Sequence, residues 1–489
     1  MVGPVERPTD MFDREWEWSA LAGFAVDPTP GATLGVVSGR RRQGKSYLLE
    51  ALCEATGGCY FVATEATEVD SLRLLADTIG ARFDLPASPS LRSWEQALDV
   101  LLALGRERAC TVVLDEFPYL CAASPALPSI VQKAFGSRRR ERTGSRTRLI
   151  LCGSALTFMG GLLSGSAPLR GRAGLDLPVA TLDYRLAAQF WEMTDWRLAV
   201  LLHAVVGGTP AYRREYSRGD VPRDLGDFDD WVARTVLNPA SPLFREARYL
   251  LAEEPDLRDK ALYHSVLGAV AEGHSTRGGI AAFVGRRDDA VHHPLTVLED
   301  AGFLRREPDI FRTNRSSFQI TEPLVAFYHA VMRPEWARLE RPGNATAVWR
   351  DARNRFDSAV LGPHFERLCR TWTATFADPT TLGGPASVVG HGVVNDPARR
   401  RTWEVDVAAV GPDGALLAVG EATWGTVVGL EQLERLRRIR QLLVVHDRAG
   451  AADARLLCFS GAGFTEDLHR AERAGEVVLV DLERLYLGS

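Results

Sequence analysis

The sequence predicts an α/β protein with a parallel β-sheet in its N-terminal part and smaller domains after it. Three observations support this class. Residues 33–37 and 111–114 are short apolar runs, typical of strands buried on both faces of a parallel sheet. A glycine-rich turn joins the first run to a helical one. The 489 residues also exceed what one hydrophobic core supports, so about two to four domains are expected.

The composition is that of an ordinary globular protein, with 46% hydrophobic and 25% charged residues. The net charge of −5 means that any contact with nucleic acid must be a local patch. No apolar run reaches the roughly 18 residues of a membrane span, and the first residues lack a signal-peptide pattern. We therefore expect a cytoplasmic protein without a membrane partner. The seven cysteines have no C-x-x-C spacing, which predicts buried free thiols.

Lysine is rare in this chain. The 58 basic residues include three lysines, Lys45, Lys133 and Lys260. A lysine that persists among so many arginines is a candidate for a role that a planar guanidinium cannot fill.

Lys45 lies in the turn SGRRRQGKS, which fits the pattern G-x-x-x-x-G-K-[ST]. Glycines let backbone N–H groups close on phosphate oxygens, and the N-terminus of the following helix adds partial positive charge. We expect Lys45 to reach the β- and γ-phosphates of ATP and Ser46 to bind Mg²⁺. The turn therefore predicts a P-loop NTPase. Its expected nucleotide-binding residues are Gly39, Gln43, Gly44, Lys45, Ser46 and Tyr47.

Three consecutive arginines, residues 40–42, occupy the variable positions of this loop. They could form a basic patch for nucleic acid. In a phosphate-binding loop the backbone does the binding, so we expect these side chains to point away into solvent.

The second apolar run ends in two acids, Asp115 and Glu116, within TVVLDEFPYL. Because the carboxyl ends of parallel strands meet at one edge of a sheet, these acids are expected near the loop. Asp115 is then a ligand for Mg²⁺ through water, and Glu116 polarises the attacking water.

A third strand-like run, RLILCGSALTFM, places Ser154 at a strand end, where its hydroxyl could report hydrolysis. An ordinary strand-to-loop serine is the alternative. Farther along, Arg170 and Arg172 in PLRGR are candidates for an arginine finger. The expected catalytic residues are Glu116, Lys45, Ser154 and Arg172.

Five ordered strings resemble the archaeal-type AAA ATPases, a STAND-like group of P-loop NTPases that also occurs in bacteria. They are FDREWEWSAL, SGRRRQGKSYLL, VVLDEFPYL, LILCGSALTFM followed by PLRGR, and VVGGTPAYR. The resemblance covers nearly the whole chain. It implies an ATPase module with Arg14 and Glu15 near the adenine pocket, and a helical lid that includes GGTPAY. From the residues alone, Gly207, Gly208 and Pro210 predict a turn between apolar helices.

Residues 258–340 have the outline of a winged helix-turn-helix: three short helices followed by a two-stranded hairpin. The expected recognition helix is acidic, which suits DNA poorly. The expected wing carries arginines. Two interpretations therefore remain: the domain packs on protein, or it binds DNA. The acids and histidines of the helix segment are Asp288, Asp289, His292, His293, Glu299 and Asp300, and the wing arginines are Arg305, Arg306, Arg312 and Arg315.

After a linker at residues 341–347, the order helix, strand, turn, strand, helix resembles a PD-(D/E)xK nuclease-like core. Glu366, Asp406 and Glu421 stand where such a core binds metal. The lysine expected two residues after Glu421 is replaced by Thr423, and no lysine follows Lys260. Arginine is a poor proton-transfer group. We interpret this as a vestigial nuclease site whose activity is lost.

The leading hypothesis is an ATP-binding, Mg²⁺-dependent ATP-hydrolysing switch protein whose nucleotide state controls its other domains. An ATP-gated DNA nuclease in defence or repair, or a DNA-binding regulator, are the alternatives. DNA is thus a candidate partner beside ATP and ADP, and an ATP-dependent homo-oligomer is a candidate assembly. The expected domains are a P-loop ATPase core at 1–185, a helical lid at 186–257, a winged-helix-like domain at 258–340 and a nuclease-like domain at 348–489.

Overall fold

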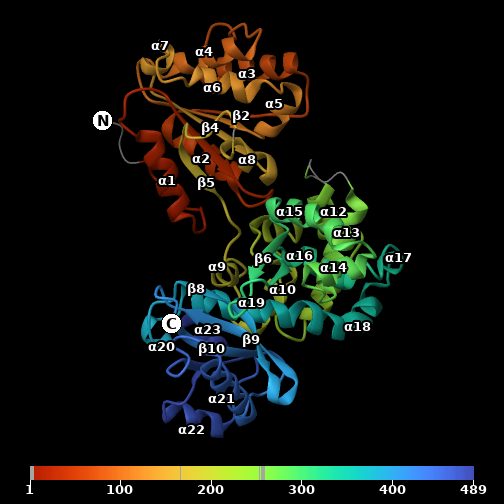
Figure 1. Cartoon of the computed structure of the whole chain (residues 1–489). Coiled ribbons are helices and arrows are strands. Elements are labelled where there is room, and N and C mark those ends of the chain that lie inside the picture. Colours follow the sequence, from red (N-terminus) through yellow and green to blue (C-terminus); the bar gives the residue numbers. More distant parts are fainter. Residues whose placement is uncertain (1–4, 166, 253, 255–258) are drawn as a thin grey trace. The chain divides into compact units, whose positions relative to one another are not determined.

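The computed structural model describes residues 5–165, 167–252, 254 and 259–489 (Figure 1). The chain forms two compact units. The first contains the described residues up to 181 together with residues 209–211, 252 and 254. The second contains residues 182–208, 212–251 and 259–489. Within the described part of the chain, no helix is both long enough and apolar enough to cross a membrane.

The first unit is built on a five-stranded sheet in which all strands are parallel. This confirms the predicted α/β class. The three inner strands are the three apolar runs that the sequence indicates. In spatial order the strands are β2 (Cys59–Val62), β3 (Cys110–Asp115), β4 (Thr147–Gly153), β1 (Thr33–Ser38) and β5 (Ala173–Pro178).

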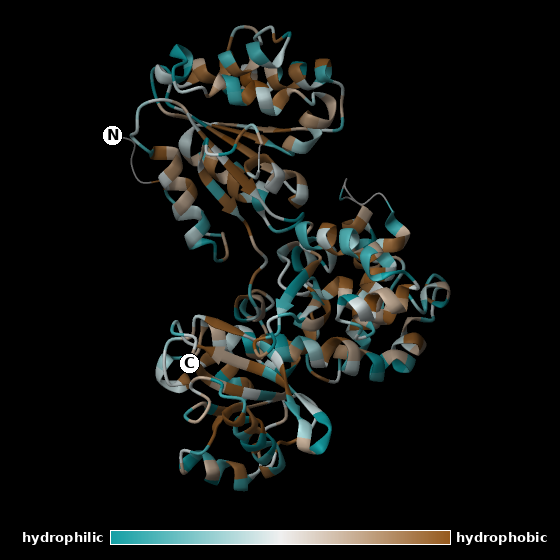
Figure 2. Ribbon diagram, viewed as in Figure 1, coloured by the Kyte–Doolittle hydropathy of each residue, from teal (hydrophilic) through white to brown (hydrophobic). Residues whose placement is uncertain are grey.

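Helices cover both faces of this sheet, so alternate strand residues enter two separate cores. Leu34 and Val36 of β1 pack in one core and Val37 in the other. Figure 2 shows the strands as the most hydrophobic part of the unit. The first core contains residues of α3 (Glu68–Arg82), α4 (Trp94–Leu104), α5 (Phe117–Ala123), α6 (Leu127–Ala134) and α8 (Leu156–Leu163), and the second contains residues of α1 (Glu15–Val26) and α2 (Lys45–Thr56).

The second unit begins with helices. Helix α10 ends at Val206, and Gly207 follows with a positive φ of 62°, so the predicted turn between helices is present. The three helices and the hairpin expected after residue 258 are also present. The helices are α9 (Tyr184–Phe190), α10 (Trp196–Val206), α11 (Phe228–Thr235), α12 (Pro242–Ala252), α13 (Lys260–Ala271), α14 (Arg277–Val284) and α15 (His292–Asp300), and the hairpin strands are β6 (Leu304–Pro308) and β7 (Ser316–Ile320).

A second five-stranded sheet lies in the C-terminal part of this unit. Strands β8, β9 and β10 are antiparallel neighbours, whereas β10, β11 and β12 are parallel. Helix α19 packs against β8, β9 and β10, and α21 also packs on the sheet. The elements are β8 (Val388–Asp396), β9 (Arg401–Val410), β10 (Leu416–Thr423), β11 (Arg455–Ser460), β12 (Val478–Val480), α19 (Gly362–Thr375) and α21 (Leu430–Val445).

The prediction of a linker at residues 341–347 is only partly correct. Helix α18 (Ala345–Phe356) begins inside it and runs through a π-helical turn, η4 (Asp357–Leu361), directly into α19. Because this helical run packs on α11 at one end and on the sheet at the other, both regions belong to one compact unit.

Candidate nucleotide site and second acidic cluster

The loop between β1 and α2 closes tightly on itself. Gly39, Arg42 and Gly44 have φ angles of 153°, 68° and 88°, in the left-handed region that favours glycine. A Cβ atom on Gly39 would lie 2.4 Å from the Val179 carbonyl oxygen and 2.9 Å from Gln43 Oε1. Glycine is therefore required at position 39, as the motif predicts.

Lys45 is held inside this loop and is only 6% exposed. Its Nζ donates to the Arg40 carbonyl oxygen at 2.7 Å. Burial lowers the pKa of the ammonium, while the carboxylates of Asp115 and Glu116 oppose that shift. The charge thus lies over the loop and within electrostatic reach of the acids at the end of β3.

Asp115 joins the end of β3 to the start of α2. Its Oδ2 accepts hydrogen bonds from Ser46 Oγ at 2.8 Å and from the Tyr60 hydroxyl at 2.6 Å, and its Oδ1 accepts from the Glu116 N–H at 2.9 Å. Burial would raise the pKa of Asp115, but hydrogen bonds from Cys152, Tyr60 and Ser46 outweigh burial and lower it. The side chain is therefore an anion beside the Ser46 hydroxyl.

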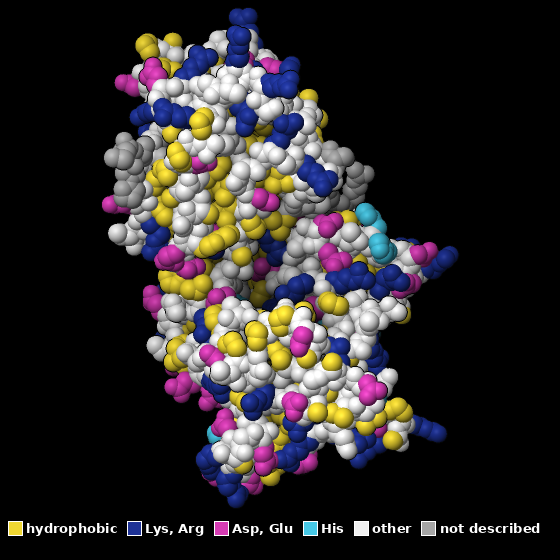
Figure 3. Space-filling view, turned by 60° about the vertical axis from the view of Figure 1, so that its left-hand side comes forward, with side chains coloured by type: hydrophobic (Ala, Val, Ile, Leu, Met, Phe, Trp, Pro, Cys, Tyr) yellow, Lys and Arg dark blue, Asp and Glu magenta, His cyan; other side chains and the backbone are white. Residues whose placement is uncertain are grey.

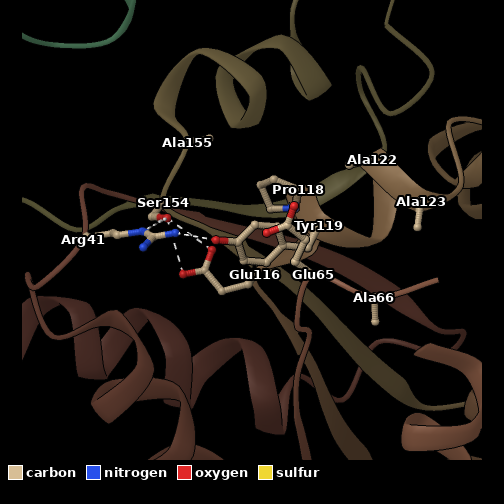
Figure 4. A pocket seen from close by; sticks show the side chains of 10 residues that line it. All are labelled: Arg41, Glu65, Ala66, Glu116, Pro118, Tyr119, Ala122, Ala123, Ser154 and Ala155. Carbon is tan, nitrogen blue, oxygen red and sulfur yellow. Dashed lines mark hydrogen bonds between the residues drawn. The ribbon is translucent and has the colours of Figure 1, made fainter. Parts of the chain in front are cut away.

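Glu116 lies next to Ser154, the residue after β4. The Ser154 hydroxyl lies 3.2 Å from Glu116 Oε2 and 3.4 Å from Oε1. Glu116 has a left-handed backbone, with φ of 52° and ψ of 42°, which is uncommon outside glycine and asparagine. This strained turn directs its side chain into a cavity of 410 Å³ (Figure 4). The cavity is lined by Arg41, Glu65, Ala66, Glu116, Pro118, Tyr119, Ala122, Ala123, Ser154 and Ala155.

The expectation of three solvated arginines in the loop is wrong. Arg40 is 9% exposed, and the half-buried Arg41 turns into the cavity (Figure 4). Arg41 Nε donates to Ser154 Oγ at 3.3 Å, and its Nη2 donates to the Tyr119 hydroxyl at 2.6 Å. The two hydroxyl groups and the Glu116 carboxylate offer a guanidinium better partners than open solvent does.

Arg14 lies against the other side of the loop. It is 7% exposed; its Nη2 donates to the backbone oxygens of Gln43 at 3.2 Å and Ala180 at 2.7 Å, and its Nη1 pairs with Glu17 at 2.7 Å. Arg14 therefore stabilises the loop backbone through hydrogen bonds. Tyr47, in the first turn of α2, is 38% exposed.

The structure does not bring Arg172 to this site. Arg172 precedes β5, whose first residue pairs with Leu34 near the start of β1, whereas the phosphate loop follows the end of β1. The two ends of a strand of this length lie about 15–20 Å apart. Within one chain, Arg172 therefore lies far from the phosphate loop, and its role as an arginine finger stays a prediction.

The residues at the carboxyl-terminal ends of β1 and β3 fit a magnesium nucleotide. The Gly39 backbone leaves room only for a hydrogen, Lys45 is a buried cation over the loop, and Ser46 and Asp115 form a hydroxyl–carboxylate pair. Oxygen ligands of this kind are those that Mg²⁺ uses beside substrate phosphates.

The second acidic cluster lies in the C-terminal sheet. Burial is the largest cause of the raised pKa of each of Glu366, Asp406 and Glu421, and the Asp406 charge raises the pKa of both glutamates further. The pKa of Glu421 rises to about 8. Among the described residues, no group of three or more His, Cys, Asp or Glu side chains is arranged to hold a metal ion.

A basic residue does reach this second cluster, and the sequence did not indicate it. Arg435 of α21 forms an ion pair with Glu421, with Nε and Oε1 3.1 Å apart. It comes from the helix after the strand, so a search for a lysine two residues beyond Glu421 could not find it.

The turn of the expected wing is joined to the C-terminal sheet, whereas Arg305, Arg306 and Arg315 are exposed. Arg305 Nε donates to Glu307 Oε1 at 3.0 Å, and Arg312 is bonded to Asn395 on β8. The N–H of Ile310, in the turn between β6 and β7, donates to the His391 carbonyl oxygen at 3.0 Å. The hairpin is thus joined to the edge of the C-terminal sheet.

Comparison with known proteins agrees with the fold of the first unit. No known family profile matches the chain. An uncharacterized protein of Methanocaldococcus jannaschii, MJECL04, is 24% identical over 309 residues, which are 62% of this chain and 65% of that protein. The chain therefore spans less than two thirds of the length of this curated relative.

Two solved structures are similar. The Walker-type ATPase PABY2304 of Pyrococcus abyssi has a TM-score of 0.50 and 21% identity, over 67% of this chain and 99% of that one. The ORC2 protein of Aeropyrum pernix has a TM-score of 0.41 and 15% identity, over 72% of this chain and 97% of that one. The chain thus contains the fold of a Walker-type ATPase, as the phosphate-loop motif predicts.

Proposed function

We propose that this chain binds ATP with Mg²⁺ and hydrolyses it. The observation that carries the proposal is the 2.8 Å hydrogen bond between Ser46 and the ionised Asp115, directly beneath a loop that holds a buried lysine. A hydroxyl and a carboxylate at this place would hold a divalent ion, which when bound neutralises charge on the phosphates. The similarity to a Walker-type ATPase supports the same conclusion.

The protein side chains have separate roles in this proposal. Lys45 and the loop N–H groups bind phosphate oxygens, and Arg14 keeps the loop backbone in place. Glu116 accepts the proton of the attacking water, and Ser154 orients the Glu116 carboxylate through the contacts of 3.2 and 3.4 Å. The strained backbone at Glu116 is typical of residues whose position serves chemistry.

We further propose that the protein is a switch. In proteins of this type, contacts to the γ-phosphate differ before and after hydrolysis, so nucleotide state can bias the arrangement of other parts. The parts in this proposal are the ATPase core, the helical lid, the winged-helix-like region and the nuclease-like region. Assembly into a homo-oligomer on ATP is an additional outcome that size measurements with ATP would reveal.

The test of this function is the variant Glu116→Gln. It should bind ATP within about 3-fold of the wild-type affinity and lose at least about 100-fold in turnover, since the amide cannot accept the proton of water. Calorimetry and phosphate release measure the two quantities. Glu65→Gln is the matched control, because Glu65 lines the same cavity but is exposed to solvent. Turnover that survives in Glu116→Gln would remove the role assigned to Glu116.

The two alternatives receive less support. Glu421 is paired with Arg435, and arginine is a poor proton-transfer group, so we propose that nuclease activity is absent. Metal-dependent DNA cleavage that is lost on Asp406→Asn would contradict this. Arg305 is bonded to Glu307 on its own strand and Arg312 to Asn395 on β8, and Figure 3 shows acidic and basic side chains interspersed over the visible face. A salt-sensitive gel shift weakened by Arg305→Gln with Arg306→Gln would instead favour a DNA-binding regulator.

A further inference from the structure

Arg41 has an unusual place for a loop arginine. Its backbone belongs to the phosphate loop, and its side chain reaches the ends of two neighbouring strands (Figure 4). The guanidinium contacts two hydroxyl groups, with Nε 3.3 Å from Ser154 Oγ and Nη2 2.6 Å from the Tyr119 oxygen. It is the basic residue among the side chains that line the cavity, where it faces Glu65 and Glu116.

The hydrogen bonds have a defined direction. A guanidinium can only donate, so the Ser154 oxygen accepts from Arg41. The single hydroxyl proton of Ser154 then points to Glu116, whose carboxylate can only accept when ionised. The result is a directed chain from Arg41 through Ser154 to Glu116. A shift of the guanidinium would therefore change how Glu116 is held.

Arg41 is also close to the phosphate-binding side of the loop. Its charge is one of those that lower the pKa of Lys45, after the larger effect of burial. Two cations that repel each other beside a loop built for phosphate are stabilised when an anion lies between them. The other candidate arginines do not have this place: Arg170 Nη1 donates to the Gly165 carbonyl oxygen at 2.7 Å, and Arg172 lies at the opposite edge of the sheet.

We infer that Arg41 is a positioning residue that senses the terminal phosphate of a nucleoside triphosphate from within the loop and sets Glu116 through Ser154. This inference rests on the proposed ATPase function and goes beyond it. It assigns to the loop itself, in the same chain, the cationic role for which the sequence offered Arg172. Arg41 should thus separate triphosphate from diphosphate, because the terminal phosphate is the group that differs.

The first test compares ATP and ADP binding by calorimetry. Arg41→Gln should weaken ATP binding about 10-fold and leave ADP binding within about 2-fold, because a charge-assisted contact to one phosphate is lost. Arg41→Lys keeps the charge but not the two-point contact with Ser154 and Tyr119. It should therefore regain most of the ATP affinity while turnover stays at least about 10-fold below wild type.

The second test is a double-mutant cycle on turnover. If Arg41 acts through Ser154, adding Arg41→Gln to Ser154→Ala should lower kcat by less than about 2-fold beyond Ser154→Ala alone. Arg73→Gln is the matched control, because Arg73 is 62% exposed on α3 and should change no binding or turnover value. Each variant should melt at the same temperature as the wild-type protein, which would verify that it is folded.

Four results would overturn the inference. Equal losses of ATP and ADP affinity in Arg41→Gln would make Arg41 a structural part of the loop. Independent, multiplying losses of kcat in the double variant would break the link through Ser154. If wild-type protein and the Arg41→Gln variant bind and turn over ATP equally well, the role of Arg41 is refuted and the proposed ATPase function stands. Wild-type protein that binds no ATP would refute the proposed function as well.

Discussion

The two carboxylate clusters of this chain use the same residue types but differ in how their charges are compensated. Asp115 accepts hydrogen bonds from Ser46, Tyr60 and the Glu116 N–H, and these lower its pKa in spite of burial. Asp406 accepts a backbone hydrogen bond from Ala422 at 2.9 Å, and burial raises its pKa. The first aspartate is held as an anion, whereas the second is under pressure to take up a proton.

The two clusters also differ in the cation that lies near them. Lys45 is buried over the loop in a chain that otherwise uses arginine almost everywhere. At the second cluster, Thr423 stands where a lysine would be expected, and Arg435 forms an ion pair with Glu421. A compact ammonium suits phosphate and metal chemistry, whereas the Arg435 guanidinium offsets only part of the burial that raises the pKa of Glu421. This difference supports our proposal that the first cluster is functional and the second is structural.

The largest effect should come from breaking the first cluster. Asp115→Asn should reduce Mg²⁺-dependent ATP turnover at least about 100-fold, because a neutral amide holds a divalent ion poorly. Asp406→Asn should leave turnover within about 2-fold of wild type. Initial rates of phosphate release over a Mg²⁺ titration measure both variants.

Asp77→Asn serves as the control for the first variant, since Asp77 is 57% exposed on α3. If Asp406→Asn lowered ATP turnover as strongly as Asp115→Asn does, the second cluster would belong to the ATPase machinery and the distinction drawn between the clusters would fail.

A smaller effect concerns stability and pH. Glu421 is 4% exposed, and burial raises its pKa to about 8, so the folded chain binds this proton more tightly than the unfolded chain does. Stability should therefore fall as the pH rises from about 4.5 to about 8. Glu421→Gln removes this loss, so the variant should melt about 2–4 °C above wild type at pH 8.5 and close to wild type at pH 5.

Circular dichroism during heating at the two pH values measures this difference. Glu434→Gln on α21 is the control, because Glu434 is 64% exposed and the variant should melt like wild type at both pH values. A Glu421→Gln variant that melts below wild type at pH 8.5 would mean that Glu421 is held as an anion, like Asp115.

The inner part of the first sheet could be predicted from sequence because β1, β3 and β4 are buried on both faces and thus read as continuous apolar runs. The edge strands could not. β2 has four residues, and β5 contains glycine and proline and leaves alternate residues exposed. In the second sheet, β8 was missed because two glycines interrupt its apolar pattern.

The candidate site was predictable where chemistry depends on local spacing. The loop, Asp115 and Glu116 follow from a motif and from strands that end at one edge of a sheet. Arg41, Arg172 and Arg435 depend on side-chain direction and on strand register over long separations in the chain, and a sequence in which arginine is so frequent gives no signal to separate them. Their roles needed the three-dimensional arrangement.

The proposed function requires that a magnesium–nucleotide complex binds between Lys45 and Asp115. Calorimetric titration of the full chain with ATP, with and without Mg²⁺, tests it most directly, beside the variant Lys45→Gln. We expect saturable, Mg²⁺-dependent heat for the wild-type chain and at least about 100-fold weaker binding for Lys45→Gln, because the buried cation over the phosphates is lost. Absence of binding by the wild-type chain, or equal binding by the variant, would contradict it.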